Sequence, residues 1–140
     1  MIKNIRHSGI VVRNIDESYK FYQNLGFNLV SDEIEKGKFL DTILGIDGCE
    51  IRVIKMSCDN QMIELLGYKI ESTFGKDIEK KVNDIGCSHI AMTVTDLDYM
   101  YNKLTKQGVE FINPPETNDK VKVCFCKDPN DVYLELVEEL

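Results

Sequence analysis

The amino-acid sequence predicts an α+β protein made of two βαβββ modules, and three observations lead to this prediction. The first is an internal repeat in which His7 aligns with His89 at an offset of 82 residues. The second is that strand-like alternation of apolar residues changes to helical spacing after each histidine. The third is a pair of similar segments, residues 62–66 and 133–137, each with a glutamate in its middle. The single domain 1–140 is therefore divided into module one at 1–68, a linker at 69–84 and module two at 85–140.

The first module begins with a strand over residues 5–13, in which Ile10 and Val12 point to one side and His7 to the other. Asn14 is suited to cap the helix that follows, and Gly26 is suited to end it. Further elements are expected in this order: a strand at 27–34, a short helix at 38–44, and strands at 49–56 and 62–66.

The second module repeats this plan with a strand at 87–95, a helix that Asp96 caps, and a stop at Gly108. A strand at 109–112, which Pro114 and Pro115 close, and strands at 121–127 and 133–137 complete the module. The offset falls from 82 at the histidines to 71 at the glutamates, so module one carries 11 extra residues, which the 38–44 helix supplies. The linker is expected to hold a helix near residues 77–84.

Composition excludes several classes of partner. The net charge of −7 leaves no basic surface for nucleic acid or for an anionic membrane. No apolar run is long enough to span a bilayer, and the N-terminus lacks the apolar core of a signal peptide. Five cysteines without a Cys-x-x-Cys spacing suit reduced thiols, so we expect a cytoplasmic protein. Cys124 and Cys126 are interpreted as small hydrophobic residues that face a core or groove.

Four residues stand out as candidates for chemistry. Glu64 and Glu135 each lie in the middle of an apolar strand, where a carboxylate faces either solvent or an occupied pocket. His7 and His89 fall on the less apolar face of their strands, beside small residues that leave room for a ligand. One such residue alone would be an ordinary surface or core residue. Two matched pairs favour a divalent metal site, because imidazole and carboxylate are common metal ligands.

The chain resembles the vicinal oxygen chelate (VOC) superfamily, which includes glyoxalase I, methylmalonyl-CoA epimerase, extradiol dioxygenases, and fosfomycin and bleomycin resistance proteins. The resemblance covers almost the whole chain, and its most specific segments are residues 6–12, 88–91 and 128–136. It implies a curved mixed sheet around a metal site, a homodimer, and the metal ligands His7, Glu64, His89 and Glu135.

This ligand set suits one divalent metal per site, Zn, Ni, Co, Mn or Fe. The resemblance then implies a lyase or isomerase of small carbonyl substrates, similar to glyoxalase I (a lactoylglutathione lyase) or to an epimerase. A metal-chelated carbonyl acidifies the neighbouring C–H, and an enediolate forms. Glu135 or Glu64 is the base that removes the proton and returns it. Return to the neighbouring carbon is isomerisation, and return to the same carbon on the other face is epimerisation.

Other functions remain open at this point. A metal-free antibiotic-binding protein would lack the ligand set, and an Fe(II) dioxygenase or a fosfomycin-type thiol transferase would leave Glu64 as a superfluous ligand. Arg6, Arg13 and Arg52 form no clear cluster in the sequence, which counts against a strict glutathione enzyme. Residues 39–45 resemble an insertion in epimerase-like relatives that act on acyl-CoA or cyclic polyol ketones, or they only cover the rim of the sheet. The sequence leaves open whether one site forms within a chain or across a dimer.

Overall fold

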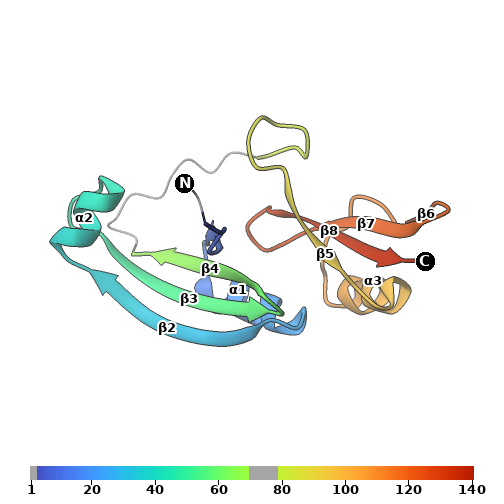
Figure 1. Cartoon of the computed structure of the whole chain (residues 1–140), viewed down its shortest axis with the longest axis horizontal. Helices are drawn as coiled ribbons and strands as arrows, with labels where there is room; N and C mark the ends of the chain where they lie inside the picture. The colour runs from blue at the N-terminus through green and yellow to red at the C-terminus, as the bar shows by residue number, and fades with distance from the viewer. Residues whose placement is uncertain (1–2, 70–78) are drawn as a thin grey trace. The chain divides into compact units, whose positions relative to one another are not determined.

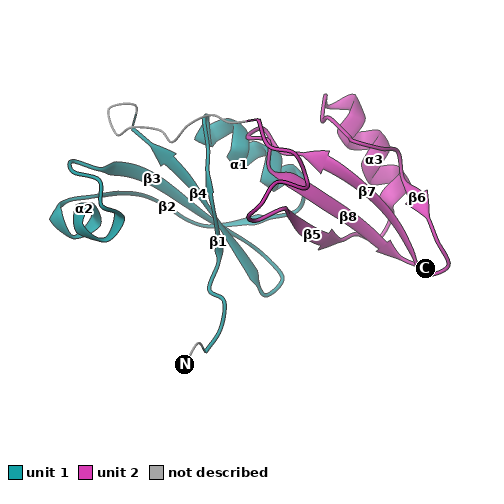
Figure 2. Ribbon diagram, turned by 90° about the horizontal axis from the view of Figure 1, so that it is seen from above, with its two compact units in different colours: residues 1–77 teal, residues 78–140 magenta. Residues whose placement is uncertain are grey.

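The computed structural model describes residues 3–69 and 79–140 (Figure 1). The chain divides into two compact units, Met1–Asp77 and Ile78–Leu140 (Figure 2), and the division falls within the segment expected as a linker. Unit 1 contains β1 (Ser8–Val11), α1 (Ile15–Asn24), β2 (Asn28–Lys36), α2 (Lys38–Leu44), β3 (Glu50–Cys58) and β4 (Gln61–Tyr68). Unit 2 contains β5 (His89–Thr93), α3 (Leu97–Lys106), β6 (Glu116–Thr117), β7 (Val121–Lys127) and β8 (Tyr133–Glu139).

Each unit holds one four-stranded mixed sheet, with the strand orders β1-β4-β3-β2 and β5-β8-β7-β6. In both, the first strand runs parallel to the last, and the last pairs antiparallel with the strand before it. The predicted α+β fold with two modules of the same topology is confirmed. The parallel pairing places Gly9 opposite Glu64 and Ala91 opposite Glu135, so equivalent residues of the repeat take equivalent positions.

The two predicted helix caps form as expected. The Asn14 side chain accepts a hydrogen bond from the backbone N–H of Glu17 at 3.1 Å, and that of Asp96 accepts one from Tyr99 at 2.9 Å. These bonds satisfy N–H groups that have no partner within the helix. Both α1 and α3 therefore begin one residue after the cap that the sequence indicated.

The main core of unit 1 lies between α1 and one face of its sheet, and that of unit 2 lies between α3 and one face of its sheet. Alternate residues of the central strands are buried there, because successive strand residues point to opposite faces. In unit 1 these are Ile54, Met56, Ile63 and Leu65, and in unit 2 they are Cys124, Cys126, Leu134 and Leu136. Burial raises the pKa of the Cys124 thiol to about 11 and that of Cys126 to about 12, so both stay protonated at neutral pH. All five cysteines are free, and the expectation that these two act as small core residues is confirmed.

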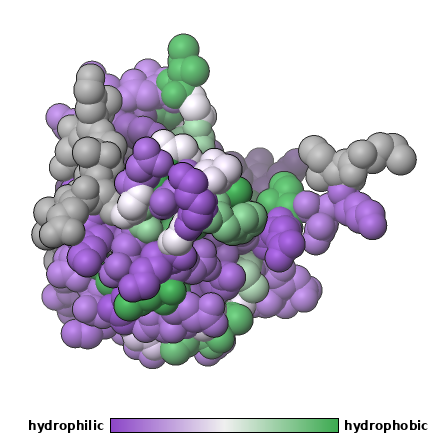
Figure 3. All heavy atoms as spheres, turned by 90° about the vertical axis from the view of Figure 1, so that its left-hand side faces the viewer, coloured by the Kyte–Doolittle hydropathy of each residue, from purple (hydrophilic) through white to green (hydrophobic). Residues whose placement is uncertain are grey.

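Helix α2, which spans the predicted 38–44 segment, packs on the other face of the unit 1 sheet. Its Leu40 is buried in a cluster with Cys49, Ile51 and Val53. Ile51 and Val53 point to the same side as Lys55, which pairs across the sheet with Glu64. The insertion therefore covers one end of the face that carries Glu64. Phe39 and Ile43 of α2 remain exposed. The surface viewed from the left-hand side of Figure 1 is mostly hydrophilic, with separate hydrophobic patches (Figure 3).

Two expected elements are wrong or lie partly outside the described residues. Residues 109–112 form only an isolated bridge at Phe111, and the short strand follows the two prolines as β6. The Asn113 side chain accepts from the N–H of Phe125, and proline lacks an N–H, so the ladder with β7 is interrupted. Of the helix expected near 77–84, residues 77–78 are not described, 79–81 are irregular, and 82–84 form a turn and a bend. The Asp84 side chain accepts from the N–H of Lys81, a local bond that competes with a helix.

No helix within the two described ranges has both the length and the apolar character that a bilayer crossing requires.

Gly67 on β4 lets α1 approach the sheet closely. A Cβ added there would lie 3.1 Å from Cδ1 and 3.2 Å from Cβ of Ile15, the first residue of α1. We expect Gly67→Ala to lower the free energy of unfolding by about 1–3 kcal/mol, because the helix has to shift. Urea denaturation would measure this, with Gly9→Ala as the control, because its new Cβ meets one flexible side chain at 3.4 Å. Equal stability of the two variants would contradict this role of Gly67.

Candidate functional site

The first predicted pair meets within unit 1. The His7 Nε2 atom lies 3.1 Å from Oε2 of Glu64. Glu64 lies on β4, where it pairs with Gly9 of the parallel strand β1. His7 lies two residues before Gly9. The Glu64 side chain is only 14% exposed, so most of its hydration is lost and a positive partner is needed.

The second predicted pair meets within unit 2 in the same way. The His89 Nε2 atom lies 3.1 Å from Oε2 of Glu135, whose side chain is 24% exposed. Ala91 lies opposite Glu135 on the parallel neighbour β5, two residues after His89. The repeat thus produces one local arrangement twice, and each unit holds one imidazole nitrogen beside one carboxylate.

The separation of 3.1 Å fits a pair of metal ligands. Two atoms that bind one cation at roughly a right angle, each about 2.1 Å away, lie about 3 Å apart. An ordinary hydrogen bond between a protonated imidazole and a carboxylate has the same length. Among the residues that the structure describes, no cluster of three or more His, Cys, Asp or Glu could hold an ion. Each pair by itself therefore brings together only two atoms that could bind a cation.

The surroundings of His89 indicate which of its nitrogens carries a proton. The Ser88 hydroxyl donates to the carbonyl oxygen of Val82 at 2.7 Å, which leaves its oxygen free to accept. The His89 Nδ1 atom lies 3.0 Å from that oxygen and is therefore assigned as the donor. In the neutral ring, Nε2 then carries a lone pair that faces the Glu135 carboxylate. Two acceptors at this distance require a second imidazole proton or a cation between them, and this donor set fits a divalent metal.

The two pairs differ in the residue that lies across the hairpin from the glutamate. Lys55 pairs with Glu64, and its Nζ atom lies 3.5 Å from Oε1 of that carboxylate. Phe125 takes the equivalent position beside Glu135, and its ring meets the His89 ring edge-on with the centroids 5.3 Å apart. The pair in unit 1 therefore has a cation beside it and the pair in unit 2 an aromatic ring, a difference that the sequence repeat does not show. The hairpin register reveals it.

A pocket of about 410 Å³ surrounds the first pair in unit 1. Its lining residues are Asn4, Arg6, His7, Lys55, Met62 and Glu64. The sequence showed no cluster of cations, but folding brings Arg6 and Lys55 to the lining of this one pocket. Arg6 makes no hydrogen bond or ion pair with any residue that the structure describes.

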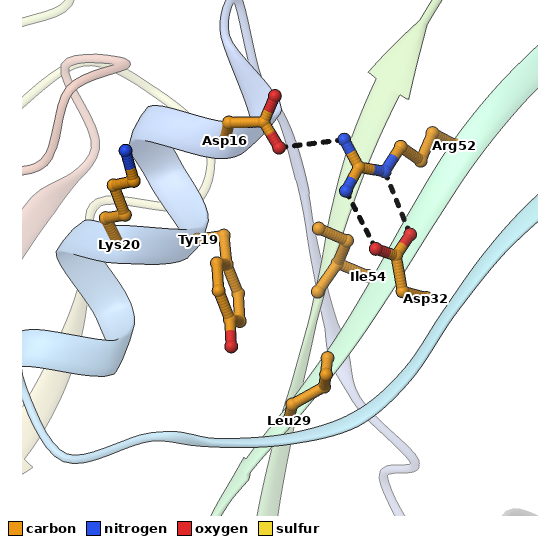
Figure 4. Close-up of a pocket in the computed structure, with 7 residues that line it drawn as sticks. All are labelled: Asp16, Tyr19, Lys20, Leu29, Asp32, Arg52 and Ile54. Atoms are coloured by element: carbon orange, nitrogen blue, oxygen red, sulfur yellow. Dashed lines mark hydrogen bonds and ion pairs between the residues drawn. The ribbon is translucent and has the colours of Figure 1, made fainter.

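A second pocket, of about 430 Å³, lies between α1 and the opposite face of the sheet (Figure 4). There the Arg52 guanidinium binds Asp32 through two nitrogens, at 2.7 and 2.9 Å, and Asp16 through a third at 2.8 Å. These bonds from Arg52 lower the pKa of Asp32 below its usual value. Unit 2 repeats the contact, with Lys122 2.7 Å from Asp98. This repeated ion pair links each helix to its sheet, so we interpret the second pocket as structural.

Comparisons with known proteins agree with this fold. The sequence profile of a family described as Glyoxalase/Bleomycin resistance protein/Dioxygenase superfamily matches residues 4–136. A lactoylglutathione lyase of Schizosaccharomyces pombe is 24% identical over 147 residues, which cover 96% of this chain and 47% of that protein. The chain thus spans about half the length of this curated relative.

Two solved structures illustrate the structural similarity. A glyoxalase family protein from Bacillus cereus superposes with a TM-score of 0.92 at 23% identity, over 100% of this chain and 96% of that chain. A genomically encoded fosfomycin resistance protein from Listeria monocytogenes, complexed with Mn(II) and sulfate ion, has a TM-score of 0.64 at 14% identity. That match covers 99% of this chain and 93% of the other.

Proposed function

Because the chain belongs to the Glyoxalase/Bleomycin resistance protein/Dioxygenase superfamily, we propose that it is a divalent-metal-dependent lyase or isomerase that moves a proton next to a substrate carbonyl. The observation that carries this proposal is the pair of identical His–Glu contacts, each at 3.1 Å, at matched positions of the repeat. The two glutamates are only 14% and 24% exposed, so these contacts differ from ion pairs on an open surface.

His7, Glu64, His89 and Glu135 are the residues proposed to hold the metal, as two pairs that share one cation. Two imidazoles and two carboxylates accept Zn, Ni, Co, Mn or Fe, and a structural relative is recorded with Mn(II). When bound, such a cation would polarise a substrate carbonyl and make the neighbouring C–H bond more acidic.

The two glutamates are proposed to have different tasks. If Glu64 left its position, it would leave Lys55 without its carboxylate partner, which is unfavourable in a partly buried place. Glu135 has no lysine or arginine against it in the described part of the chain, only His89. We therefore assign Glu135 to remove the substrate proton and return it, and Glu64 to stay in place. If the proton returns to the same carbon on the other face, the enzyme is an epimerase. If it returns to the adjacent carbon, the enzyme is a glyoxalase-type isomerase.

The proposal extends to the assembly and the substrate. A small carbonyl compound is the proposed substrate, and a homodimer is the proposed assembly. The His7–Glu64 and His89–Glu135 pairs of one metal site then come either from the same chain or from two chains. Light scattering of the purified protein would give the oligomeric state.

The experiment that tests the function combines metal analysis with proton exchange. We expect one divalent cation per chain by elemental analysis of protein dialysed with Zn, Ni, Co, Mn or Fe(II). In D₂O, NMR should then show metal-dependent loss of a C–H signal from at least one α-hydroxyketone, 2-acyl-CoA or hemithioacetal. The proposal would be contradicted if the protein bound no cation, or if its affinity for the substrate were the same with and without metal. Either result would favour a metal-free binding protein.

A further inference from the structure

The pocket around His7 and Glu64 carries a positive charge that the rest of the chain does not predict. The whole chain has a net charge of −7, yet the pocket lining contains two permanent cations, Arg6 and Lys55, and one carboxylate. Glu64 already contacts Lys55 and His7, which leaves Arg6 without a counter-charge among the described residues. Where cations outnumber carboxylates in a concave surface, the local potential attracts anions.

The repeat provides an internal comparison for these cations. At the offset of 82 residues Arg6 corresponds to Ser88, and at the hairpin offset of 70 residues Lys55 corresponds to Phe125. Unit 2 folds with the same topology without either charge, so the module does not require them for its structure. Arg52 and Lys122, by contrast, are both basic and both bind the first-turn aspartate of their helix. The fold accounts for those two cations and leaves Arg6 and Lys55 unexplained.

The geometry of Lys55 leaves it available for a ligand. Its side chain is 34% exposed, and its Nζ atom is 3.5 Å from Glu64, longer than the roughly 2.7–2.9 Å of a strong charge-assisted hydrogen bond. An ammonium group offers three donors, and this long contact occupies at most one of them. The remaining donors can bind an oxyanion at the pocket mouth while the contact with Glu64 is kept.

We propose that Lys55 and Arg6 form an anion-binding subsite beside the His7–Glu64 pair, which selects substrates that carry a carboxylate or phosphate group close to the reacting carbon. This substrate class rests on the proposed function, but anion binding at the pocket does not depend on the reaction.

The test measures anion binding in EDTA-treated full-length protein by two-dimensional ¹H–¹⁵N NMR. Inorganic phosphate and acetate are titrated separately, so that the two kinds of anion are distinguished. We expect saturable shifts of amide signals at residues 4–7, 55 and 62–64. Lys55→Met is expected to weaken the binding of the preferred anion at least about tenfold, and Lys55→Arg to restore it to within a few-fold.

The matched control is Lys36→Met, which removes the same charge from a lysine 3.7 Å from Glu50 on the opposite face of the same sheet. It should leave anion binding unchanged, while Arg6→Met should weaken it. Equal weakening by Lys36→Met, shifts spread over the surface, or tight binding that survives Lys55→Met would each overturn the subsite. Anion binding that depends on Lys55 in a protein that binds no metal would support the subsite and contradict only the proposed function.

Discussion

His7→Ala and His89→Ala are each expected to lower the affinity for divalent metal at least about 100-fold, and by nearly the same factor. Each substitution removes one ligand, and changes outside the ligand shell alone typically cost 10–100-fold. The similar factors follow from the repeat, since both imidazoles lie 3.1 Å from their glutamates. Isothermal titration with Zn or Mn would measure the affinities, and thermal unfolding would show that the variants fold.

Mixing the two histidine variants would reveal how the halves of the site combine. If one site joins His7 of one chain with His89 of another, a mixed dimer contains one site with both histidines intact, and metal binding partly returns. If each site forms within one chain, mixing restores nothing. Metal affinity that is unchanged in either single variant would contradict the four-ligand centre. Tyr99→Ala, which alters an exposed side chain on α3, serves as a control for handling and folding.

The internal repeat explains why much of the fold and the four candidate ligands could be predicted. Strand alternation has a period of two residues, so Ile10 and Val12 could be assigned to the buried side and His7 to the other. Helix starts followed from capping chemistry at Asn14 and Asp96, which is local in sequence. The segment before β6 could not be predicted in this way. There the Asn113 side chain replaces a backbone acceptor, a tertiary contact that no periodicity reveals.

The cations beside the His7–Glu64 pair also depend on tertiary contacts that the sequence pattern does not reveal. Lys55 lies nine residues before Glu64, and Phe125 lies ten before Glu135, because the second hairpin is one residue longer. A fixed offset therefore aligns the glutamates but not their cross-strand neighbours, and the contrast between lysine and phenylalanine is lost. Arg6 comes to the same pocket only because β1 pairs with β4, at the other end of the module. The four candidate ligands lie within the repeated motif and could be recognised from the sequence. The residues that make the two copies different, such as Lys55 and Phe125, could be identified only from the pairing of the strands.

Glu135→Gln is expected to slow substrate C–H exchange by about 10²–10⁴-fold at saturating metal, the range that a positioned general base contributes. Glutamine keeps an oxygen that can bind a cation, but it cannot accept the proton. Glu64→Gln is expected to act mainly on metal affinity, and it leaves the Lys55 ammonium without its carboxylate. Exchange rates in D₂O, measured by NMR over a metal titration, separate an effect on the rate at saturation from an effect on metal affinity.

Glu139→Gln is the matched control, because it neutralises an exposed carboxylate at the end of the same strand β8. It should change neither quantity. If Glu135→Gln exchanged at the full rate while Glu64→Gln lost exchange at saturating metal, the base would be Glu64. Glu64, the carboxylate beside Lys55, would then transfer the proton. The presence of Lys55 beside one glutamate and Phe125 beside the other would not explain which glutamate acts as the base. Glu135→Gln and Glu64→Gln therefore test both the identity of the base and the proposed difference between the two His–Glu pairs.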